Sequence, residues 1–184
     1  DRSPGQVLVT GANGSLGRGL IGHLHGAGAK VRALVRSERA ATTLRALAPA
    51  PEIAIVDWSD AAGLARATEG CDAAVHLVGV LKETPAQRYA DAHEGTANAL
   101  AAAAKQSGMH RIVYLSIVGA SVDAKNACLA SKARAEAILL ATPWEATLDA
   151  VRALGPLDGV IVMDATNPLG AGLSLLAGPH GESG

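Results

Sequence analysis

The sequence predicts an α/β protein in which a doubly wound parallel sheet is covered by helices on both faces, giving three layers. Two observations carry this prediction. Short apolar runs alternate with helical patterns along most of the 184 residues. The runs are continuously apolar instead of alternating with polar residues, which is typical of parallel strands buried on both faces. We expect one domain spanning residues 1–184.

The expected strands are short segments rich in Val, Leu, Ile and Ala. They cover residues 6–10, 30–36, 52–57, 71–79 and 111–119. The expected helices begin near Ser, Asn or Pro and often end at Gly, as helix start and stop signals require. They cover residues 15–28, 37–48, 59–70, 85–108 and 126–141. Strands and helices therefore repeat as βα units.

Composition narrows the classes of protein that fit. The net charge is −1, so no basic field indicates a nucleic-acid partner. No segment reaches the roughly 18 apolar residues of a membrane span, so we expect no transmembrane segment. Cys71 and Cys128 are far apart, and the six histidines have no metal-ligand spacing, so we expect no metal site. Two unpaired cysteines favour a reducing, cytoplasmic setting.

A glycine-rich loop, "VTGANGSLGRGL" at residues 9–20, follows the first expected strand and opens the first expected helix. In this context the glycine triplet predicts a dinucleotide cradle. Gly11 would allow a tight turn, Gly14 would let the backbone approach a pyrophosphate, and Gly17 would let the helix pack closely on the strand. The alternative is a glycine-rich turn that binds no ligand.

The start of that helix is the expected phosphate site. Amide groups around Ser15 and Leu16 lie at the positive end of the helix dipole and have no partner inside the helix. We expect them to bind phosphate oxygens, and we expect Asn13 in the loop to contact the cofactor as well.

With Thr10 before it, "TGANGSLG" resembles the short-chain dehydrogenase/reductase superfamily in its extended and atypical branches, which implies a Rossmann-like fold. In that fold an acid after the second strand binds the ribose of NAD, whereas an arginine suits the 2′-phosphate of NADP. Here Arg36 and Ser37 follow the strand, and no acid precedes Glu38. We predict a preference for NADP(H), with NAD(H) as the alternative; a merely solvated arginine is the other interpretation. Arg18 and Arg32 are two further cations that could add charge.

The ends of the third and fourth strands complete the expected cofactor site. The resemblance implies that Asp57 hydrogen-bonds the adenine amino group, beside Trp58. The alternative is that Asp57, or Ser59, caps the following helix. The resemblance also places backbone of the fourth strand end along the adenine ribose, at the residues Leu77, Val78 and Gly79.

Carbonyl-reducing members of the superfamily use a Ser or Thr, a Tyr that is the general acid, and a Lys four residues after the Tyr. Ser116 matches the serine and Lys132 matches the lysine, so both are candidates for catalysis and cofactor binding. Cys128 stands where the tyrosine is expected. A thiol is shorter than a phenol, so we expect weak carbonyl reduction or none.

The stretch from "VHLVGVLKE" at residue 75 to "SKARAEAILL" at residue 140 is similar to atypical short-chain dehydrogenases related to the nucleotide-binding accessory subunit of respiratory complex I. The resemblance covers about residues 6–141. It implies a protein that holds NADP(H) structurally or as a sensor. It also implies association with a respiratory complex or with itself, in the cytoplasm or at the periphery of the inner membrane.

Two alternative functions stay open. One is an active oxidoreductase that passes hydride to a quinone, flavin or deazaflavin, using Ser116 and Lys132. The other is a scaffold with an empty site.

The tail differs from this family. It predicts a helix at 143–154 and a strand at 159–165, and "DATNPLG" at 164–170 resembles deazaflavin-dependent NADP reductases and their dinucleotide-binding relatives. We therefore expect a join between two Rossmann pieces near residues 141–143, either natural or engineered.

Overall fold

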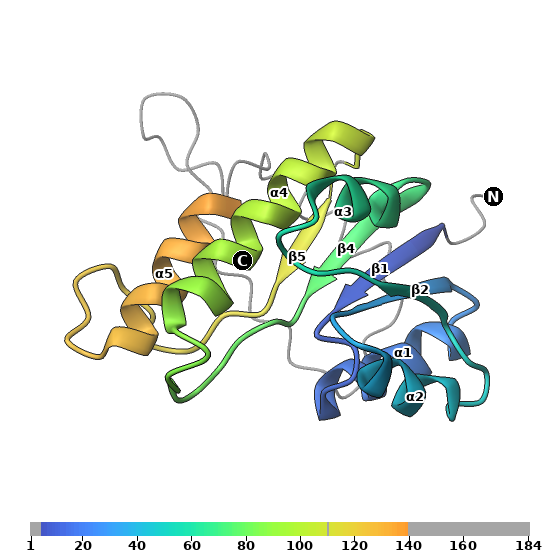
Figure 1. The fold of residues 1–184 in the computed structure, drawn as a ribbon, viewed down its shortest axis with the longest axis horizontal. Coiled ribbons are helices and arrows are strands. Elements are labelled where there is room, and N and C mark those ends of the chain that lie inside the picture. The colour runs from blue at the N-terminus through green and yellow to red at the C-terminus, as the bar shows by residue number, and fades with distance from the viewer. Residues whose placement is uncertain (1–4, 110, 140–184) are drawn as a thin grey trace, which may run out of the picture.

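The computed structural model describes residues 5–109 and 111–139. Their centre is a five-stranded sheet with the order β3-β2-β1-β4-β5, in which every neighbouring pair is parallel (Figure 1). The strands are β1 (Gln6–Thr10), β2 (Lys30–Val35), β3 (Glu52–Ile55), β4 (Cys71–His76) and β5 (Ile112–Tyr114). This order reverses direction between β1 and β4, which is the topological switch point of a doubly wound sheet.

Helices cover both faces of the sheet, which confirms the predicted α/β fold of three layers (Figure 1). The helices are α1 (Ser15–Gly26), α2 (Glu38–Arg45), α3 (Ala61–Thr68), the π-helical turn η1 (Asp91–Gly95), α4 (Thr96–Ser107) and α5 (Ala127–Leu139). The α1 and α2 helices lie on one face, and α3, α4 and α5 lie on the other. None of the helices in residues 5–109 and 111–139 is long and apolar enough to cross a membrane.

The core forms because successive strand residues point to opposite faces. Val7 and Val9 of β1 pack with Ile21 of α1 on one side, whereas Leu8 packs with Leu100 of α4 on the other. Both faces of β1 are therefore apolar. This is why the strand reads in the sequence as a continuous apolar run.

Four of the expected strands end earlier than the sequence predicts, and two of them end at least three residues earlier. The expected strands 71–79 and 111–119 leave the sheet after His76 and Tyr114. The apolar residues beyond these points belong to loops at the carboxyl edge of the sheet. A run of apolar residues does not by itself show where sheet hydrogen bonding stops.

The expected helix 85–108 begins later than predicted. Thr84 and Gln87 exchange backbone hydrogen bonds of 3.0 and 3.1 Å, which close a turn containing Pro85. The carboxylate of Glu83 then accepts a 2.8 Å hydrogen bond from the backbone N–H of Tyr89. Helical structure therefore starts after this turn.

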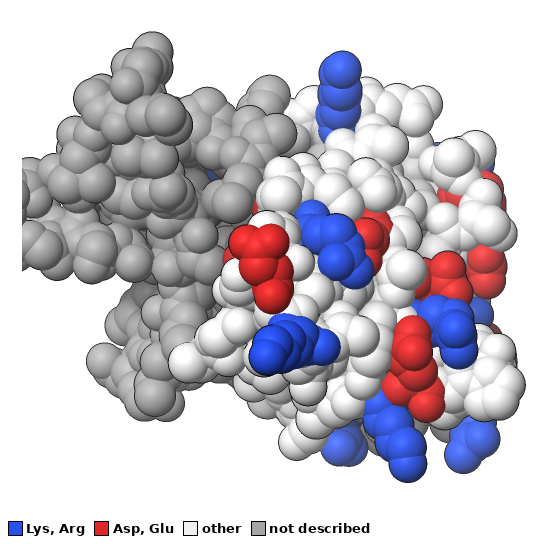
Figure 2. All heavy atoms as spheres, turned by 90° about the vertical axis from the view of Figure 1, so that its left-hand side faces the viewer, with Lys and Arg blue, Asp and Glu red and all other residues white. Residues whose placement is uncertain are grey.

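The expected tail elements at 143–154 and 159–165, the 164–170 motif and the join near 141–143 lie outside the described residues. Figure 2 shows one face of the molecule, where acidic and basic side chains are interspersed.

Candidate functional site

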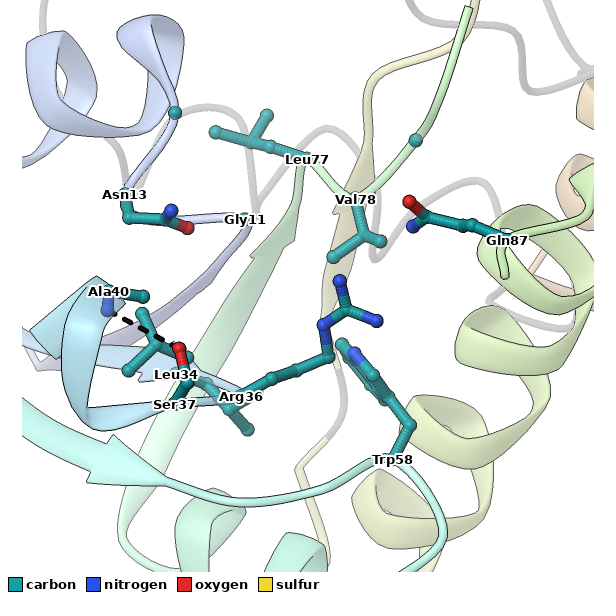
Figure 3. Close-up of a pocket in the computed structure, with 13 residues that line it drawn as sticks. Gly11, Asn13, Leu34, Arg36, Ser37, Ala40, Trp58, Leu77, Val78 and Gln87 are labelled. Atoms are coloured by element: carbon teal, nitrogen blue, oxygen red, sulfur yellow. Dashed lines mark hydrogen bonds between the residues drawn. The ribbon is translucent and has the colours of Figure 1, made fainter. Parts of the chain in front are cut away.

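A pocket of about 310 Å³ opens at the carboxyl edge of β1, β2 and β4, at the switch point of the sheet (Figure 3). Nine of the residues expected to bind a cofactor line it. They are Gly11, Asn13, Gly14, Arg36, Ser37, Trp58, Leu77, Val78 and Gly79. Ligands of doubly wound α/β proteins bind in this crevice. The sheet topology and the glycine motif therefore lead to the same place.

Glycine is required at different positions of the loop for different structural reasons. Gly11 has a φ of +66°, a conformation that side chains disfavour, and a Cβ there would lie 2.9 Å from the backbone carbon of Leu77. A Cβ on Gly17 would lie 2.6 Å from the Gly11 carbonyl oxygen and 2.7 Å from the Cα of Ala12. Gly11 and Gly17 therefore allow close backbone packing. Gly14 lines the pocket itself.

The N-terminus of α1 comes directly after the glycine loop. Gly14 occupies the N-cap position without a side-chain cap, and the first turn holds no acid. The amides of Ser15 and Leu16 thus retain their capacity to bind an anion. Ser15, Leu16 and Gly17 do not themselves line the pocket.

A cation reaches into the pocket from the end of β2. Arg36 follows Val35, is exposed, and extends toward Trp58 and Val78 (Figure 3). Ser37 caps α2 by accepting a 3.4 Å hydrogen bond from the amide of Ala40. The lining residues include no carboxylate. This side of the pocket therefore combines a guanidinium, a hydroxyl and a helix N-terminus, which together favour an anionic group.

The two additional arginines lie elsewhere. Arg32 donates to Glu52 at 2.8 Å and to the carbonyl oxygens of Ala67 and Glu69 at 2.9 and 2.7 Å. These contacts hold Arg32 away from the pocket, near the amino ends of β1 and β4. Arg18 lines a separate cavity beside α1. Neither arginine therefore lines the cofactor pocket.

Asp57 holds the loop after β3. Its carboxylate accepts hydrogen bonds from the amide and hydroxyl of Ser59, at 2.9 and 2.6 Å. The Ser59 hydroxyl, together with its amide, holds the Asp57 pKa below its usual range, and Arg36 adds to the effect. Asp60 caps α3 by accepting from the amide of Gly63 at 2.8 Å, so the alternative that Asp57 or Ser59 caps this helix is wrong. Trp58 lines the pocket, whereas Asp57 is exposed beside it.

Four lining residues were not expected from the sequence: Leu34, Val35, Ala40 and Gln87. Leu34, Val35 and Ala40 come from β2 and α2, where their apolar character indicates core packing. The Gln87 side chain enters the pocket from the turn that replaces the start of the expected long helix (Figure 3). No sequence signal separates such a glutamine from an ordinary surface residue.

Lys132 lies next to the pocket wall without lining the pocket. A Cβ on Gly79 would be 3.1 Å from Lys132 Nζ and 3.4 Å from His93 Nε2. Lys132 Nζ donates a 3.0 Å hydrogen bond to the Leu115 carbonyl oxygen and lies 4.4 Å from the centre of the Tyr114 ring. Burial lowers the pKa of Lys132. The ammonium is therefore held by a carbonyl and an aromatic face, close to the backbone of Gly79.

The structure also reveals a buried histidine behind the pocket. His76 Nδ1 lies 2.7 Å from the Thr10 hydroxyl, and His76 Nε2 lies 3.2 Å from the Thr96 hydroxyl. The Thr96 hydroxyl donates to the Ala92 carbonyl at 2.7 Å, so it accepts from Nε2–H. This network assigns the neutral tautomer with the proton on Nε2. Burial, reinforced by Lys132 and His93, lowers the pKa of His76 to about 3.

His93 is a second histidine that sequence reasoning missed. Its Nε2 accepts a 3.1 Å hydrogen bond from the amide of Val80, and its ring stacks on Tyr89 at 5.6 Å. Burial and the Lys132 ammonium lower its pKa. His93 therefore supports the loop that follows Gly79.

The remaining candidates gather on α5 and on the loop after β5. The Ser116 hydroxyl donates to the carboxylate of Glu136. Cys128 is buried, with its Sγ 3.6 Å from the Val80 carbonyl oxygen. Ser116, Cys128 and Lys132 do not line the pocket. Along residues 5–109 and 111–139, no cluster of three or more metal-ligating side chains is present, and both cysteines are free.

Comparison with known proteins places the chain in a family. A family model described as NAD(P)H-binding matches residues 11–155. Over 125 residues, the chain is 33% identical to a 4-hydroxy-2-methyl-3-oxo-4-farnesyl-3,4-dihydroquinoline-1-oxide ketoreductase of Stigmatella aurantiaca. This match covers 65% of the chain and 36% of the relative. Over 133 residues, the chain is 28% identical to the mitochondrial NADH dehydrogenase (ubiquinone) 1 alpha subcomplex subunit 9 of Rattus norvegicus. This match covers 71% of the chain and 35% of the relative.

The fold has a solved counterpart in an NADPH-dependent quinone oxidoreductase from Escherichia coli, complexed with NADPH. The two share 22% identity and a TM-score of 0.59, over 72% of this chain and 44% of that one. The chain spans about a third to a half of the length of the curated relatives that it matches. The similarity to the complex I subunit confirms the predicted kinship with that group.

Proposed function

Because this chain belongs to the NAD(P)H-binding family, we propose that it binds NADP(H) in preference to NAD(H) at the switch point of the sheet. The single observation that carries the preference is Arg36, a guanidinium that extends over a pocket whose lining holds no carboxylate. An acid at this place would accept from the ribose hydroxyls of NAD and repel a 2′-phosphate. A guanidinium matches phosphate geometry.

We assign the phosphate groups of the cofactor to two sets of residues. Gly14, Asn13 and the amides of Ser15 and Leu16 bind the pyrophosphate. Arg36 and Ser37 bind the 2′-phosphate.

The remaining residues of the pocket wall contact adenine and the riboses of the cofactor. Trp58 packs against adenine, with Asp57 beside it. Leu77, Val78 and Gly79 follow the ribose, and Lys132 reaches the nicotinamide end past Gly79. These assignments are supported by the pocket lining and by the 3.1 Å approach of Lys132 Nζ to the Cβ position of Gly79.

Carbonyl reduction is weak at neutral pH in this proposal. Cys128 occupies the place of the general-acid tyrosine, and its thiol faces the Val80 carbonyl, at 3.6 Å from the oxygen. A bound nicotinamide supplies hydride chemistry. This chain would give it a positioned ammonium and a serine, but no phenol that donates a proton.

A second candidate function is hydride transfer to a quinone or flavin. It is favoured because Lys132 bonds the carbonyl of Leu115, the residue directly before Ser116. An acceptor oxygen could therefore lie near both Ser116 and Lys132. The fold relative from Escherichia coli is a quinone oxidoreductase. The kinship with the complex I subunit supports assembly into a larger complex, in the cytoplasm or beside the inner membrane, as the corresponding non-catalytic role.

Thermal unfolding with saturating NADPH and, in parallel, with saturating NADH tests the proposal. A ligand that binds only the folded state at 100 times its Kd adds about 2.7 kcal/mol of stability. We expect a clear rise in Tm with NADPH and a smaller rise with NADH. Equal rises would remove the NADP(H) preference, and no rise with either would contradict cofactor binding.

A further inference from the structure

One face of α5 carries three polar side chains four residues apart, Cys128, Lys132 and Glu136. Residues at this spacing lie above one another on a helix. Lys132 and Glu136 both meet the loop after β5, since Lys132 bonds the Leu115 carbonyl and Glu136 accepts from the Ser116 hydroxyl. A half-buried carboxyl group therefore lies directly behind the serine of the candidate site.

We propose that Glu136 supplies the proton for carbonyl reduction through the hydroxyl of Ser116, in place of the tyrosine that is absent at position 128. This inference rests on the proposed binding of NADP(H). It assigns a role to Glu136 that the tyrosine-serine-lysine pattern does not contain.

The protonation state of Glu136 decides what Ser116 can do. An ionised carboxylate only accepts, so the Ser116 hydroxyl donates to it and presents lone pairs to a substrate. A protonated carboxyl can instead donate to Ser116 Oγ. The Ser116 proton is then free to point at a carbonyl oxygen, which is the role of a general acid.

The reaction then balances. The carbonyl carbon accepts a hydride from NADPH, which becomes NADP⁺, and the C=O π bond breaks. The oxygen takes the Ser116 proton, and Ser116 takes the proton of Glu136. Solvent returns a proton to Glu136. The sum is one carbonyl, one NADPH and one proton, which give one alcohol and one NADP⁺.

Burial and the charges around Glu136 set the pH range in which its carboxyl group is protonated. Burial raises the pKa of Glu136, and the Lys132 ammonium one turn away opposes that rise. Tyr114 on β5 and Cys128 on α5 are the other titratable groups facing this cluster. The protonated, donating form of Glu136 is therefore lost as the pH rises through its raised pKa. We expect reduction to be strongest on the acid side and to fall toward neutral pH.

Glu94 offers a matched control. Its carboxylate, on η1, accepts a 2.8 Å hydrogen bond from Ser131 of α5, so a second Ser–Glu pair also involves this helix. It also pairs with Arg134 at 3.0 Å. The Glu94 carboxylate bonds to Ser131 and Arg134 and not to the side chain of Ser116 or Lys132. Glu94→Gln therefore removes a comparable carboxylate without touching the proposed relay.

The first test uses the protein without cofactor. ¹³C NMR of the glutamate carboxyl carbons follows titration, with the Glu136 resonance assigned from its loss in Glu136→Gln. We expect a midpoint above that of ordinary glutamates, which moves in Ser116→Ala and stays in Glu94→Gln. A Glu136 midpoint at or below the ordinary value, or one that Ser116→Ala does not move, overturns the proposal. This readout does not depend on NADPH, so failed cofactor binding is seen separately in the thermal unfolding experiment.

The second test follows NADPH oxidation with phenanthrenequinone and with an aromatic ketone as probes, across pH. In the wild type and in Glu94→Gln, ketone reduction should fall about tenfold per pH unit above the Glu136 midpoint. Glu136→Gln should lose about 100-fold of the acid-side rate and show a flat profile. A wild-type profile in Glu136→Gln overturns the proposal. So does the absence of ketone turnover at acid pH in wild-type protein that binds NADPH.

Discussion

Gly79 and Lys132 connect the cofactor pocket to α5. A Cβ on Gly79 would lie 3.1 Å from Lys132 Nζ, and that ammonium is bonded to the Leu115 carbonyl at 3.0 Å. Gly79 belongs to the pocket wall, whereas Lys132 belongs to the helix that carries the candidate catalytic groups. Any side chain at Gly79 thus acts on both parts of the site.

We predict that Gly79→Ala displaces the Lys132 ammonium and weakens NADPH binding about threefold to tenfold, since a charged hydrogen bond is lost or distorted. Fluorescence titration with NADPH measures this change. In a Lys132→Met background the same Gly79→Ala substitution should have little further effect, because the displaced group is already gone. Full additivity of the two substitutions would show that Gly79 acts without Lys132.

Two of the glycines of α1, Gly17 and Gly19, should change the stability of the fold in opposite directions when replaced by alanine. A Cβ on Gly17 meets the Gly11 carbonyl oxygen at 2.6 Å, so Gly17→Ala should cost about 1–3 kcal/mol of unfolding free energy. A Cβ on Gly19 meets nothing within 4 Å, so Gly19→Ala should gain about 0.5–1 kcal/mol from helix propensity. Urea unfolding measures both. Stabilisation by Gly17→Ala would disprove the close packing of α1 on the glycine loop.

His76 should make the stability of the fold sensitive to acid. Its pKa is about 3 in the folded protein, below the ordinary value of 6.5, so the unfolded chain binds the extra proton between these values. The contribution of neutral His76 is fully present above about pH 6.5 and is lost progressively as the pH falls toward 3, by at most about 1.4 kcal/mol per pH unit. Urea unfolding as a function of pH should show a shallower acid slope in His76→Asn than in the wild type. Identical slopes would exclude His76 as a source of the acid sensitivity.

Cys128 should be dispensable for cofactor binding and for any residual reduction. Its thiol is buried and directed at the Val80 carbonyl. We expect Cys128→Ala to change the NADPH affinity and the rate of phenanthrenequinone reduction by less than about twofold. A much larger loss of rate with unchanged affinity would make the thiol part of the chemistry.

The sequence predicted the sheet and the glycine loop well because both depend on local signals. Continuous apolar runs such as residues 6–10 mark buried parallel strands. Within the same βα unit, Gly11 is required by its φ of +66° and Gly17 by its close packing on Gly11 and Ala12. The placement of Arg36 followed for the same reason, since it comes directly after β2. These features need no knowledge of distant contacts.

Other parts of the site depend on long-range packing and could not be predicted. Gln87 reaches the pocket because a turn around Pro85 replaces helix, and Arg32 is drawn to Glu52 on the neighbouring strand. His76 and His93 read as isolated histidines until the fold buries them next to Lys132. The Ser116–Glu136 contact joins residues 20 apart in sequence.

The most direct test of the NADP(H) preference is calorimetric titration of NADPH and NADH into the wild type, Arg36→Ala and Arg39→Ala. Arg39 is an exposed arginine three residues on that does not line the pocket, so it controls for a change in net charge. We predict that Arg36→Ala weakens the binding of NADPH about 10-fold to 100-fold, as expected for the loss of a charged hydrogen bond to phosphate, and changes the NADH affinity by less than about twofold. The affinities of Arg39→Ala for both cofactors should stay within about twofold of the wild type. Equal losses of NADPH and NADH affinity in Arg36→Ala would contradict the account.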